Sequence, residues 1–379
     1  MTYSVYQHWD PLKVCIVGRS YSPEFYHFIK NDRARTVMER IARETEEDYQ
    51  KLITLLESFG VEIWRPNVSD DYKHYLYNNN KIYPPPMTPC DYSIMVGDTF
   101  YHNWLTELRV YNDIKADFWP NIQTMEEFNN LPQYMKNEVF DVVKKTGYMS
   151  SNSYDDIITK IKKHNKVVET PFKDASAVLH RAYITRIGKD LYIGTNEEIG
   201  INISNNVAKL FTQYRTNVVD TKGHADSSFC PVVPGLIVSL ENVQKYEKTF
   251  PGWEVIYLPD QSWDKVQPFL DLKEKNQGKW WVPGEELNDD FIDFVEEWLG
   301  HWVGFVEETV FDVNMLVIDR HNVVCNNYNK EVFEAFERHS VTPHVINFRH
   351  RYFWDGGLHC ITSDIHREGT MQDYFPGRE

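Results

Sequence analysis

One local unit recurs along this chain and restricts the folds that the chain can adopt. The unit is a β-hairpin, followed by a helix, a break in the pattern and a strand with branched apolar residues. Its helix and strand occur three times, at Leu52–Ile63, Val243–Ile256 and Val332–Ile346. Repetition of one α/β unit predicts a repeat architecture. A radial arrangement of such units would bring loops from several of them around a central channel.

Turn residues between apolar segments predict the hairpins of this unit. The hairpins are expected at Tyr92–Tyr101, Tyr183–Ile193 and Met315–Cys325. We therefore expect an α/β fold that forms a single domain over residues 1–379. A two-domain α/β protein is the competing interpretation, although no segment between the units has the composition of a linker.

The N-terminal part of the chain carries a clear helix signal. A short buried strand is expected to end at Gly18. Apolar side chains on one face then predict a long helix from about Thr36 to Ser58. Gly60 would cap the C-terminus of this helix. The following segment, Val61–Trp64, is expected to be a strand.

Other stretches do not fit the repeated unit. Residues 67–90 are polar and rich in proline, so we expect a long surface loop that leads to Asp91. A helix is predicted at Glu107–Phe118. Residues from about 120 to 170 are polar and rich in asparagine, with an amphipathic stretch at Asp156–Lys163. We interpret them as an insertion, which either covers a site or is a solvated decoration.

The charge balance argues against one class of partner. The formal net charge is -16 at pH 7 and no basic run occurs. A nucleic-acid partner is not expected, because phosphate binding needs a basic face. An acidic protein can instead attract cationic small molecules, such as guanidines and amines, into a cleft lined by carboxylates.

Cysteine usage and hydropathy indicate the cellular setting. The chain has five cysteines and no CxxC pair. This pattern argues against a disulfide framework and a structural zinc site, and it fits a reducing compartment. The N-terminal residues show no apolar region typical of a signal peptide, and no apolar run approaches the length of a membrane span. We therefore expect a cytoplasmic protein with no membrane partner.

The stretch Trp354–Asp364 carries the main signal for chemistry. Gly356 and Gly357 allow a tight turn or a close approach of the backbone to a ligand. Cys360 follows them, next to a histidine. We interpret Cys360 as a thiolate nucleophile. The alternative is a structural cysteine in the last strand, since free cysteine is among the most buried residue types.

A second signal is the His-x-Asp segment formed by His224 and Asp226, which precedes a strand at Leu236–Val238. Two residues apart on an extended segment, the two side chains would point to the same side. The alternative is a turn with a hydrogen-bonded histidine. A histidine can activate a cysteine thiolate, and carboxylates bind a planar guanidinium through paired N–H groups. Together these groups suit attack of sulfur on an electrophilic carbon, with histidine moving the proton.

Three segments together resemble the amidinotransferase family, in particular its L-arginine:glycine type. They are Trp9–Arg19, His224–Asp226 and the ending Gly356–Thr370. The resemblance covers most of the chain in order, except about residues 120–170. The last motif is long and specific, whereas the other two are short but fall in the right sequence.

The resemblance implies a five-bladed α/β propeller and a covalent mechanism. Cys360 would attack the guanidinium carbon of a donor such as arginine, and ornithine would leave. An amine acceptor such as glycine would then take the amidino group from the cysteine. By position, His224 is similar to the catalytic histidine of the family.

The resemblance also implies a set of substrate-binding residues. Asp91 and Asp226 are similar to the carboxylates that bind the guanidinium. Asn314 and Arg349 match further residues of the family and are assigned to the same substrate-binding group. No metal and no organic cofactor is implied.

Two departures from the family pattern concern the site. The position of the carboxylate that orients the catalytic histidine falls on His180, and Asp174 could serve only if about six residues are inserted. A histidine would not stabilise an imidazolium as a carboxylate does. In addition, an arginine expected shortly after the strand Leu236–Ser239 is replaced by Leu240–Val243, so the carboxylate of the donor would be held differently, or the donor is not arginine.

These observations leave alternatives open. A hydrolase or deiminase on the same scaffold would use water in place of the amine acceptor, and the difference depends on exclusion of water from the site. A non-catalytic binding homologue is favoured by the His180 departure and opposed by the presence of Cys360, His224 and the two aspartates. The expected partners are a small guanidino donor and an amine acceptor. The oligomeric state is open, with a homodimer as one option.

Overall fold

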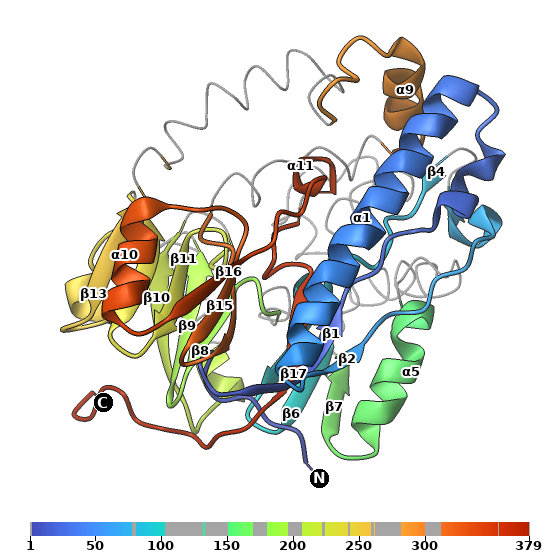
Figure 1. Ribbon diagram of the computed structural model, residues 1–379. Helices are drawn as coiled ribbons and strands as arrows, with labels where there is room; N and C mark the ends of the chain where they lie inside the picture. The colour runs from blue at the N-terminus through green and yellow to red at the C-terminus, as the bar shows by residue number, and fades with distance from the viewer. Residues whose placement is uncertain are drawn as a thin grey trace.

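The computed structural model has a mixed α/β fold built from small sheets and helices (Figure 1). It describes residues 2–77, 81–102, 132, 151–169, 180–195, 207–221, 224–241, 243–258, 261, 282–299, 312–354 and 356–378. Within these residues the strands form five sheets of three strands and one sheet of two strands. No ladder between the named strands joins one of these sheets to another.

The five three-stranded sheets share one topology. In each, an antiparallel pair of strands is followed by a third strand that lies parallel to the second. The units are β5 (Ser93–Val96), β6 (Thr99–His102) and β7 (Lys166–Glu169); β8 (Ile184–Ile187), β9 (Asp190–Thr195) and β10 (Arg215–Asp220); β11 (Phe229–Val233), β12 (Leu236–Leu240) and β13 (Glu254–Leu258); β14 (Leu316–Asp319), β15 (Asn322–Cys325) and β16 (Thr342–Val345); and β17 (Thr362–Arg367), β1 (Leu12–Val17) and β2 (Glu62–Trp64). The predicted repeat of a hairpin and a following strand is confirmed.

The fifth unit joins the two ends of the chain. The C-terminal strand β17 pairs with β1 in antiparallel register, with Val17 opposite Thr362 and Leu12 opposite Arg367. The strand predicted before Gly18 is therefore the central strand of this sheet. Because β17 directly follows Cys360, this pairing anchors the segment that carries the expected nucleophile.

The long helix α1 (Asp32–Ser58) begins earlier than predicted. The side chain of Asn31 accepts hydrogen bonds from the backbone N–H groups of Arg33 and Ala34, which caps the helix and moves its start from Thr36 to Asp32. Its C-terminus ends as expected, because Gly60 has a φ of 74°, a left-handed value that favours glycine. The buried face includes Leu52 and Leu56, and full burial of each such side chain contributes about 1.5–3 kcal/mol.

The other described helices are shorter. They are η1 (Pro23–Phe28), η2 (Tyr72–Tyr75), η3 (Pro89–Asp91), α5 (Ser151–Lys162), α7 (Tyr246–Thr249), α9 (Asp289–Phe294), η5 (Val295–Leu299), α10 (Lys330–Arg338) and α11 (Arg351–Trp354). The helix α5 confirms the amphipathic stretch predicted from Asp156. Within the described part of the chain, no helix combines the length and the apolar character needed to cross a membrane.

Residues 67–90 contain more regular structure than the predicted loop. The helix η2 is followed by a two-stranded sheet of β3 (Leu76–Tyr77) and β4 (Lys81–Ile82), and η3 then begins at Pro89. The polar and proline-rich composition hid these short elements, because each is too short to show a hydrophobic period. The predicted helix at 107–118 lies outside the described residues, as does most of the expected insertion, which stays a prediction.

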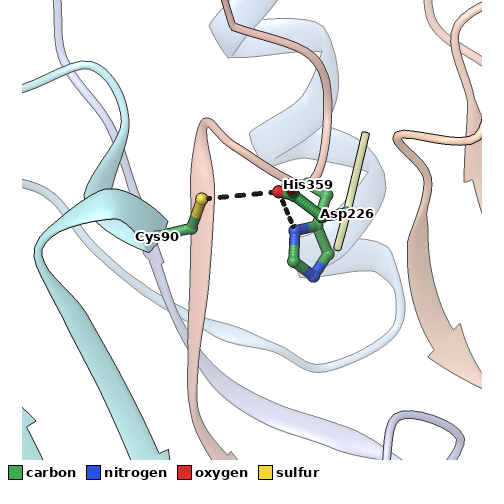
Figure 2. Close-up of side chains that lie close together, drawn as sticks. All are labelled: Cys90, Asp226 and His359. Carbon is green, nitrogen blue, oxygen red and sulfur yellow. Dashed lines mark hydrogen bonds and ion pairs between the residues drawn. The ribbon is translucent and has the colours of Figure 1, made fainter. Parts of the chain in front are cut away.

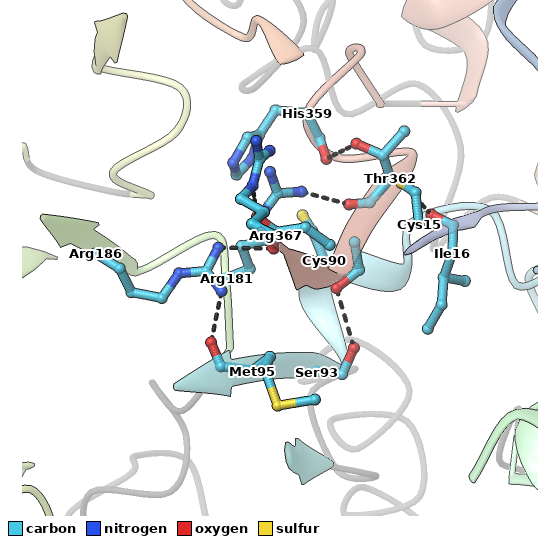
Figure 3. A network of polar contacts seen from close by, with 12 residues as sticks. Cys15, Ile16, Cys90, Ser93, Met95, Arg181, Arg186, His359, Thr362 and Arg367 are labelled. Carbon is cyan, nitrogen blue, oxygen red and sulfur yellow. Dashed lines mark hydrogen bonds and ion pairs between the residues drawn. The ribbon is translucent and has the colours of Figure 1, made fainter. Parts of the chain in front are cut away.

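A buried cluster of charges ties several units together (Figure 3). Asp364 of β17 accepts from Arg186 of β8 at 2.7 Å and from Arg367 at 2.6 Å, and Arg181 pairs with it at 3.2 Å. The arginines also donate to backbone carbonyls of other units, from Arg186 to Met95 of β5 and from Arg367 to Val317 of β14. Burial alone would raise the pKa of Asp364, but the three arginines hold it well below its usual value.

Candidate active site

Cys360 is fully buried in the turn between α11 and β17. Asn314 holds this turn: its side-chain oxygen accepts from the backbone N–H of His359 at 2.8 Å and of Cys360 at 3.2 Å. Its amide nitrogen donates to Cys360 Sγ at 3.0 Å. Gly357 is required here, because a Cβ at this position would lie 2.4 Å from Asn314 Oδ1. One amide group thus positions both the backbone and the sulfur of Cys360.

The carboxyl group of Asp226 lies at the centre of the site. Its Oδ2 atom is 2.7 Å from His359 Nδ1, 3.5 Å from Cys360 Sγ and 3.7 Å from Cys90 Sγ. Figure 2 shows the contacts of Cys90 and His359 converging on this oxygen of Asp226. The other oxygen, Oδ1, is buried and has no hydrogen-bond partner in the structure described here. A buried oxygen of this kind can accept from a ligand donor.

Backbone hydrogen bonds hold the segments of the site together. The N–H of Cys90 donates to the carbonyl of Cys360 at 3.4 Å, and the N–H of Arg181 donates to the carbonyl of Cys90 at 3.0 Å. The N–H groups of Ala225 and Asp226 in turn donate to the carbonyl of Ala182. Segments that are far apart in sequence are therefore fixed beside one another without relying on their side chains.

The surroundings of the site raise the pKa values of its acidic groups and so disfavour their charged forms. Burial raises the pKa of Asp226 to about 8, with the nearby Asp91 adding to the shift. The hydrogen bond with Cys90 lowers the pKa of Cys360, but burial and the two aspartates outweigh it and raise the pKa to about 11. Burial also raises the pKa of the Cys90 thiol well above its usual value. An added cation would favour the ionised forms of all three groups.

The surroundings of His359 favour its neutral form. Burial lowers its pKa well below the usual value, and the positive charge of Arg181 acts in the same direction. Because burial raises the pKa of Asp226 and lowers that of His359, both shifts favour the uncharged forms of the two groups that share the 2.7 Å contact. Neither His359 nor Cys90 was assigned to the site from the sequence, although each directly adjoins a residue that was, Cys360 or Asp91.

The predicted site residues fall into different surroundings. Asp226, Asn314 and Cys360 are in mutual contact. Asp91 adjoins them, because its Oδ1 atom accepts from the Cys90 thiol at 3.3 Å. Arg349 has its described contacts on α1 instead, where its guanidinium pairs with the carboxylates of Glu44, Glu47 and Asp48.

His224 and His180 lie together in an aromatic group with Tyr183. The ring centroids of the two histidines are 5.6 Å apart, and those of Tyr183 and His224 are 4.5 Å apart. The segment that carries His224 is a turn rather than the expected extended stretch, since Ser227 and Ser228 donate to its backbone carbonyl. Asp226 therefore faces Cys360 through the turn and not through strand alternation. Asp174 lies outside the described residues.

Cys90, Asp226 and His359 could also hold a metal ion. One possible ligand atom from each lies within 4.8 Å of the others. A set of sulfur, oxygen and nitrogen donors suits zinc among the common divalent ions. This arrangement was not expected from the sequence, because the three residues are widely separated along the chain.

Comparison with known proteins gives relatives over nearly the whole chain, although no protein-family model matches it. The chain is 23% identical over 401 residues to the mitochondrial glycine amidinotransferase of Xenopus tropicalis. The aligned region covers 98% of this chain and 84% of that relative. It is 24% identical over 202 residues to an L-arginine:L-lysine amidinotransferase of Pseudomonas savastanoi pv. phaseolicola, covering 51% of this chain and 46% of that protein.

Solved structures resemble the fold over a similar extent. An inosamine-phosphate amidinotransferase from Streptomyces griseus matches with a TM-score of 0.62 and 17% sequence identity, over 98% of this chain and 99% of that one. An amidinotransferase of the saxitoxin biosynthetic pathway from Microseira wollei matches with a TM-score of 0.60 and 16% identity, over the same shares of the two chains, 98% and 99%.

Proposed function

We propose that this chain, which is similar to amidinotransferases over nearly its whole length, transfers an amidino group from L-arginine to an amine acceptor through an amidino-cysteine on Cys360. Glycine and lysine are the first acceptors to test, since they appear in the names of the relatives. The observation that carries the proposal is the buried Asp226 beside Cys360, with one carboxyl oxygen unpartnered among the described residues.

The charges of the site suit a guanidinium substrate. Asp226, Asp91 and two thiols lie close together in a buried region, and burial and mutual repulsion raise the pKa values of Asp226, Cys90 and Cys360. A planar cation with several N–H donors would offset these shifts, because an opposite charge favours both carboxylate and thiolate. The substrate would thereby help to form the nucleophile that attacks it.

The proposed reaction has two half-reactions. In the first, the Cys360 thiolate forms a C–S bond to the guanidinium carbon, and the bond from that carbon to the ornithine nitrogen breaks as the nitrogen takes a proton. In the second, the acceptor nitrogen forms a bond to the same carbon, loses a proton, and the C–S bond breaks to restore the thiolate. We assign both proton transfers to His224, with His180 as its neighbour.

Burial of the sulfur favours transfer over hydrolysis. Cys360 has no exposed surface, and a covalent intermediate at such a site is protected from water until an amine enters. A hydrolase would pass the amidino group to water and release urea after ornithine has left, whereas a deiminase would expel ammonia in the first step and release citrulline after water attacks. The same assay therefore distinguishes these reactions.

We further propose that the five repeated units are the blades of a propeller. The support is their common topology and the buried arginines that link β8, β14 and β5 to β17. A single domain, a cytoplasmic location and a homodimer remain predictions. The curated glycine amidinotransferase described above is mitochondrial, so that relative lends no support to a cytoplasmic location.

The decisive experiment is intact-mass spectrometry of the protein after incubation with L-arginine, with ornithine, citrulline and urea assayed in solution. We expect a mass gain on the wild type and on Cys325→Ala, which removes another buried cysteine, but not on Cys360→Ala. Ornithine should appear with the adduct, and glycine or lysine should erase the gain. Citrulline without ornithine would show a deiminase reaction instead, urea with ornithine would show hydrolysis of the adduct, and no adduct with any guanidino compound would refute the proposal.

A further inference from the structure

Arg351 is a buried cation with unused hydrogen-bond donors. The residue is only 7% exposed, and its Nε and Nη1 atoms have no hydrogen-bond partner among the described residues. Its described side-chain contacts are with the neighbouring Tyr352, where Nη2 donates to the hydroxyl at 3.0 Å and the guanidinium lies 4.8 Å from the ring centroid. Buried polar groups are normally paired, so two unpartnered N–H groups on one guanidinium indicate a missing acceptor.

The nearby Arg349 shows what a satisfied arginine looks like in the same segment. Its Nε atom donates to Asp48 at 2.9 Å, and its Nη2 atom donates to Glu47 at 2.7 Å. These contacts hold the segment to α1. No carboxylate of the described residues pairs with Arg351 in this way, so its charge is not explained by the packing of the segment.

Arg351 lies on the segment that leads directly to Cys360. Its carbonyl accepts from the N–H of Gly356 at 3.4 Å, and a Cβ built on Gly356 would lie 4.0 Å from the Cβ of Cys360. Figure 1 places α11, which begins with Arg351, between β16 and α1. The helix is held on its other residues, because Trp354 donates to Thr45 of α1 at 2.8 Å and Phe353 lies against Phe291 of α9.

We propose that Arg351 forms an anion subsite for the carboxylate of an amino-acid substrate whose nitrogen end lies at Cys360. A carboxylate presents two oxygens to the unpartnered Nε and Nη1 donors, which matches the fork geometry of a guanidinium. The subsite rests on the proposed function for its substrate. It also supplies a carboxylate anchor in a chain that has Leu240, Glu241 and Asn242 where the family pattern led us to expect an arginine.

The test compares ligands that differ only in the carboxylate. L-arginine and agmatine share the guanidino group, and agmatine lacks the carboxylate. We expect the wild type to form the Cys360 adduct faster with arginine than with agmatine, by about tenfold to a hundredfold at limiting substrate. In Arg351→Met this preference should disappear because the rate with arginine falls, while the slower rate with agmatine stays the same.

A second arm distinguishes the donor from the acceptor. Discharge of the preformed adduct is measured with glycine and with ethanolamine, which lacks a carboxylate. Loss of the glycine preference in Arg351→Met, with the arginine preference intact, would assign the subsite to the acceptor and still support it. Preferences that are unchanged in both arms would overturn the proposal.

Two further variants keep the test interpretable. Arg351→Lys retains the charge without the fork and should restore part of the preference, and thermal unfolding checks that each variant is folded. Arg349→Met separates the two arginines, since loss of the preference there and not in Arg351→Met would place the subsite at Arg349 and refute the inference. If the wild type forms no adduct, calorimetric binding of arginine and agmatine is compared instead, and equal affinities would overturn the subsite independently of the reaction.

Discussion

At the scale of single residues, the site is defined by acidic groups that are buried without a matching positive charge among their described contacts. Asp226 is the clearest case, because one oxygen of its carboxyl group contacts two thiols and an imidazole. The strain is electrostatic and not steric. It should therefore appear in the pH dependence of stability rather than in the packing of the site.

The first prediction concerns Asp226→Asn. Burial raises the pKa of Asp226 to about 8 in the folded protein, against an ordinary value of 3.8 for aspartate. The folded state therefore holds a proton that the unfolded state releases, and its stability falls as pH rises from about 4 through about 8. Asparagine does not titrate, so the variant should be more stable than the wild type above pH 8, by about 2–5 kcal/mol. Urea unfolding across this pH range measures the difference.

The two proteins should converge below about pH 3, where Asp226 is protonated in both states. A stability difference that does not change with pH would contradict the raised pKa. The variant should also lose turnover with arginine, because the carboxylate proposed to bind the guanidinium is gone.

At the scale of elements, the turn between α11 and β17 depends on a single amide. Asn314 accepts from two successive N–H groups of the turn and donates to the sulfur within it. The absence of a side chain at Gly357 leaves room for this amide. Of the two adjacent glycines, Gly357 is therefore explained by its close contact with Asn314.

The second prediction concerns Gly357→Ala. The added methyl group would displace Asn314, so we expect a loss of about 1–3 kcal/mol in stability and a strong fall in activity, since Cys360 would lose its amide contact. Denaturant unfolding and adduct formation with arginine measure the two effects. Gly60→Ala is the matched control, because no atom lies within 4 Å of its added Cβ and only its positive φ is strained. Equal activity losses in both variants would argue against a specific role for the turn.

At the scale of the whole molecule, the units are connected by a buried charge cluster rather than by continuous sheets. Asp364 balances Arg181, Arg186 and Arg367, all of which are nearly or fully inaccessible to solvent. Each arginine also donates to a backbone carbonyl of another unit: Arg181 to Thr362, Arg186 to Met95 and Arg367 to Val317. The cluster therefore acts as a shared centre for elements that have no strand pairing between them.

The third prediction concerns Asp364→Asn. Removing the one negative charge leaves three buried arginines, which should cost about 3–5 kcal/mol of stability. The pKa of Asp364 lies well below its usual value, so the wild type should lose this advantage only as pH falls below the unfolded value for aspartate. Asp373→Asn, which removes a carboxylate that pairs with Arg215 at the surface, is the control and should have little effect. Similar losses of stability in both variants would show that the buried cluster has no special role.

Local signals in the sequence were sufficient for several elements and for part of the site. Turn residues between apolar segments predicted the hairpins β5–β6, β8–β9 and β14–β15, since turn chemistry depends on neighbouring residues. The apolar face of α1 was likewise predicted from a local signal, the helical spacing of its apolar residues. Cys360 and Asp226 were chosen by motif, and the structure places them in contact.

Other features depended on contacts between distant parts of the chain. Pairing of β17 with β1 brings the two ends together, and no local pattern specifies that register. Cys90 and His359 meet at Asp226 only because backbone hydrogen bonds align their segments. Arg349 and Arg351 are the same residue type two positions apart, so the sequence does not distinguish them. Arg349 pairs with α1, whereas Arg351 has donors without a partner among the described residues. The sequence by itself determined which groups were present and which local elements formed, whereas burial and long-range packing decided which groups meet and which remain unpaired.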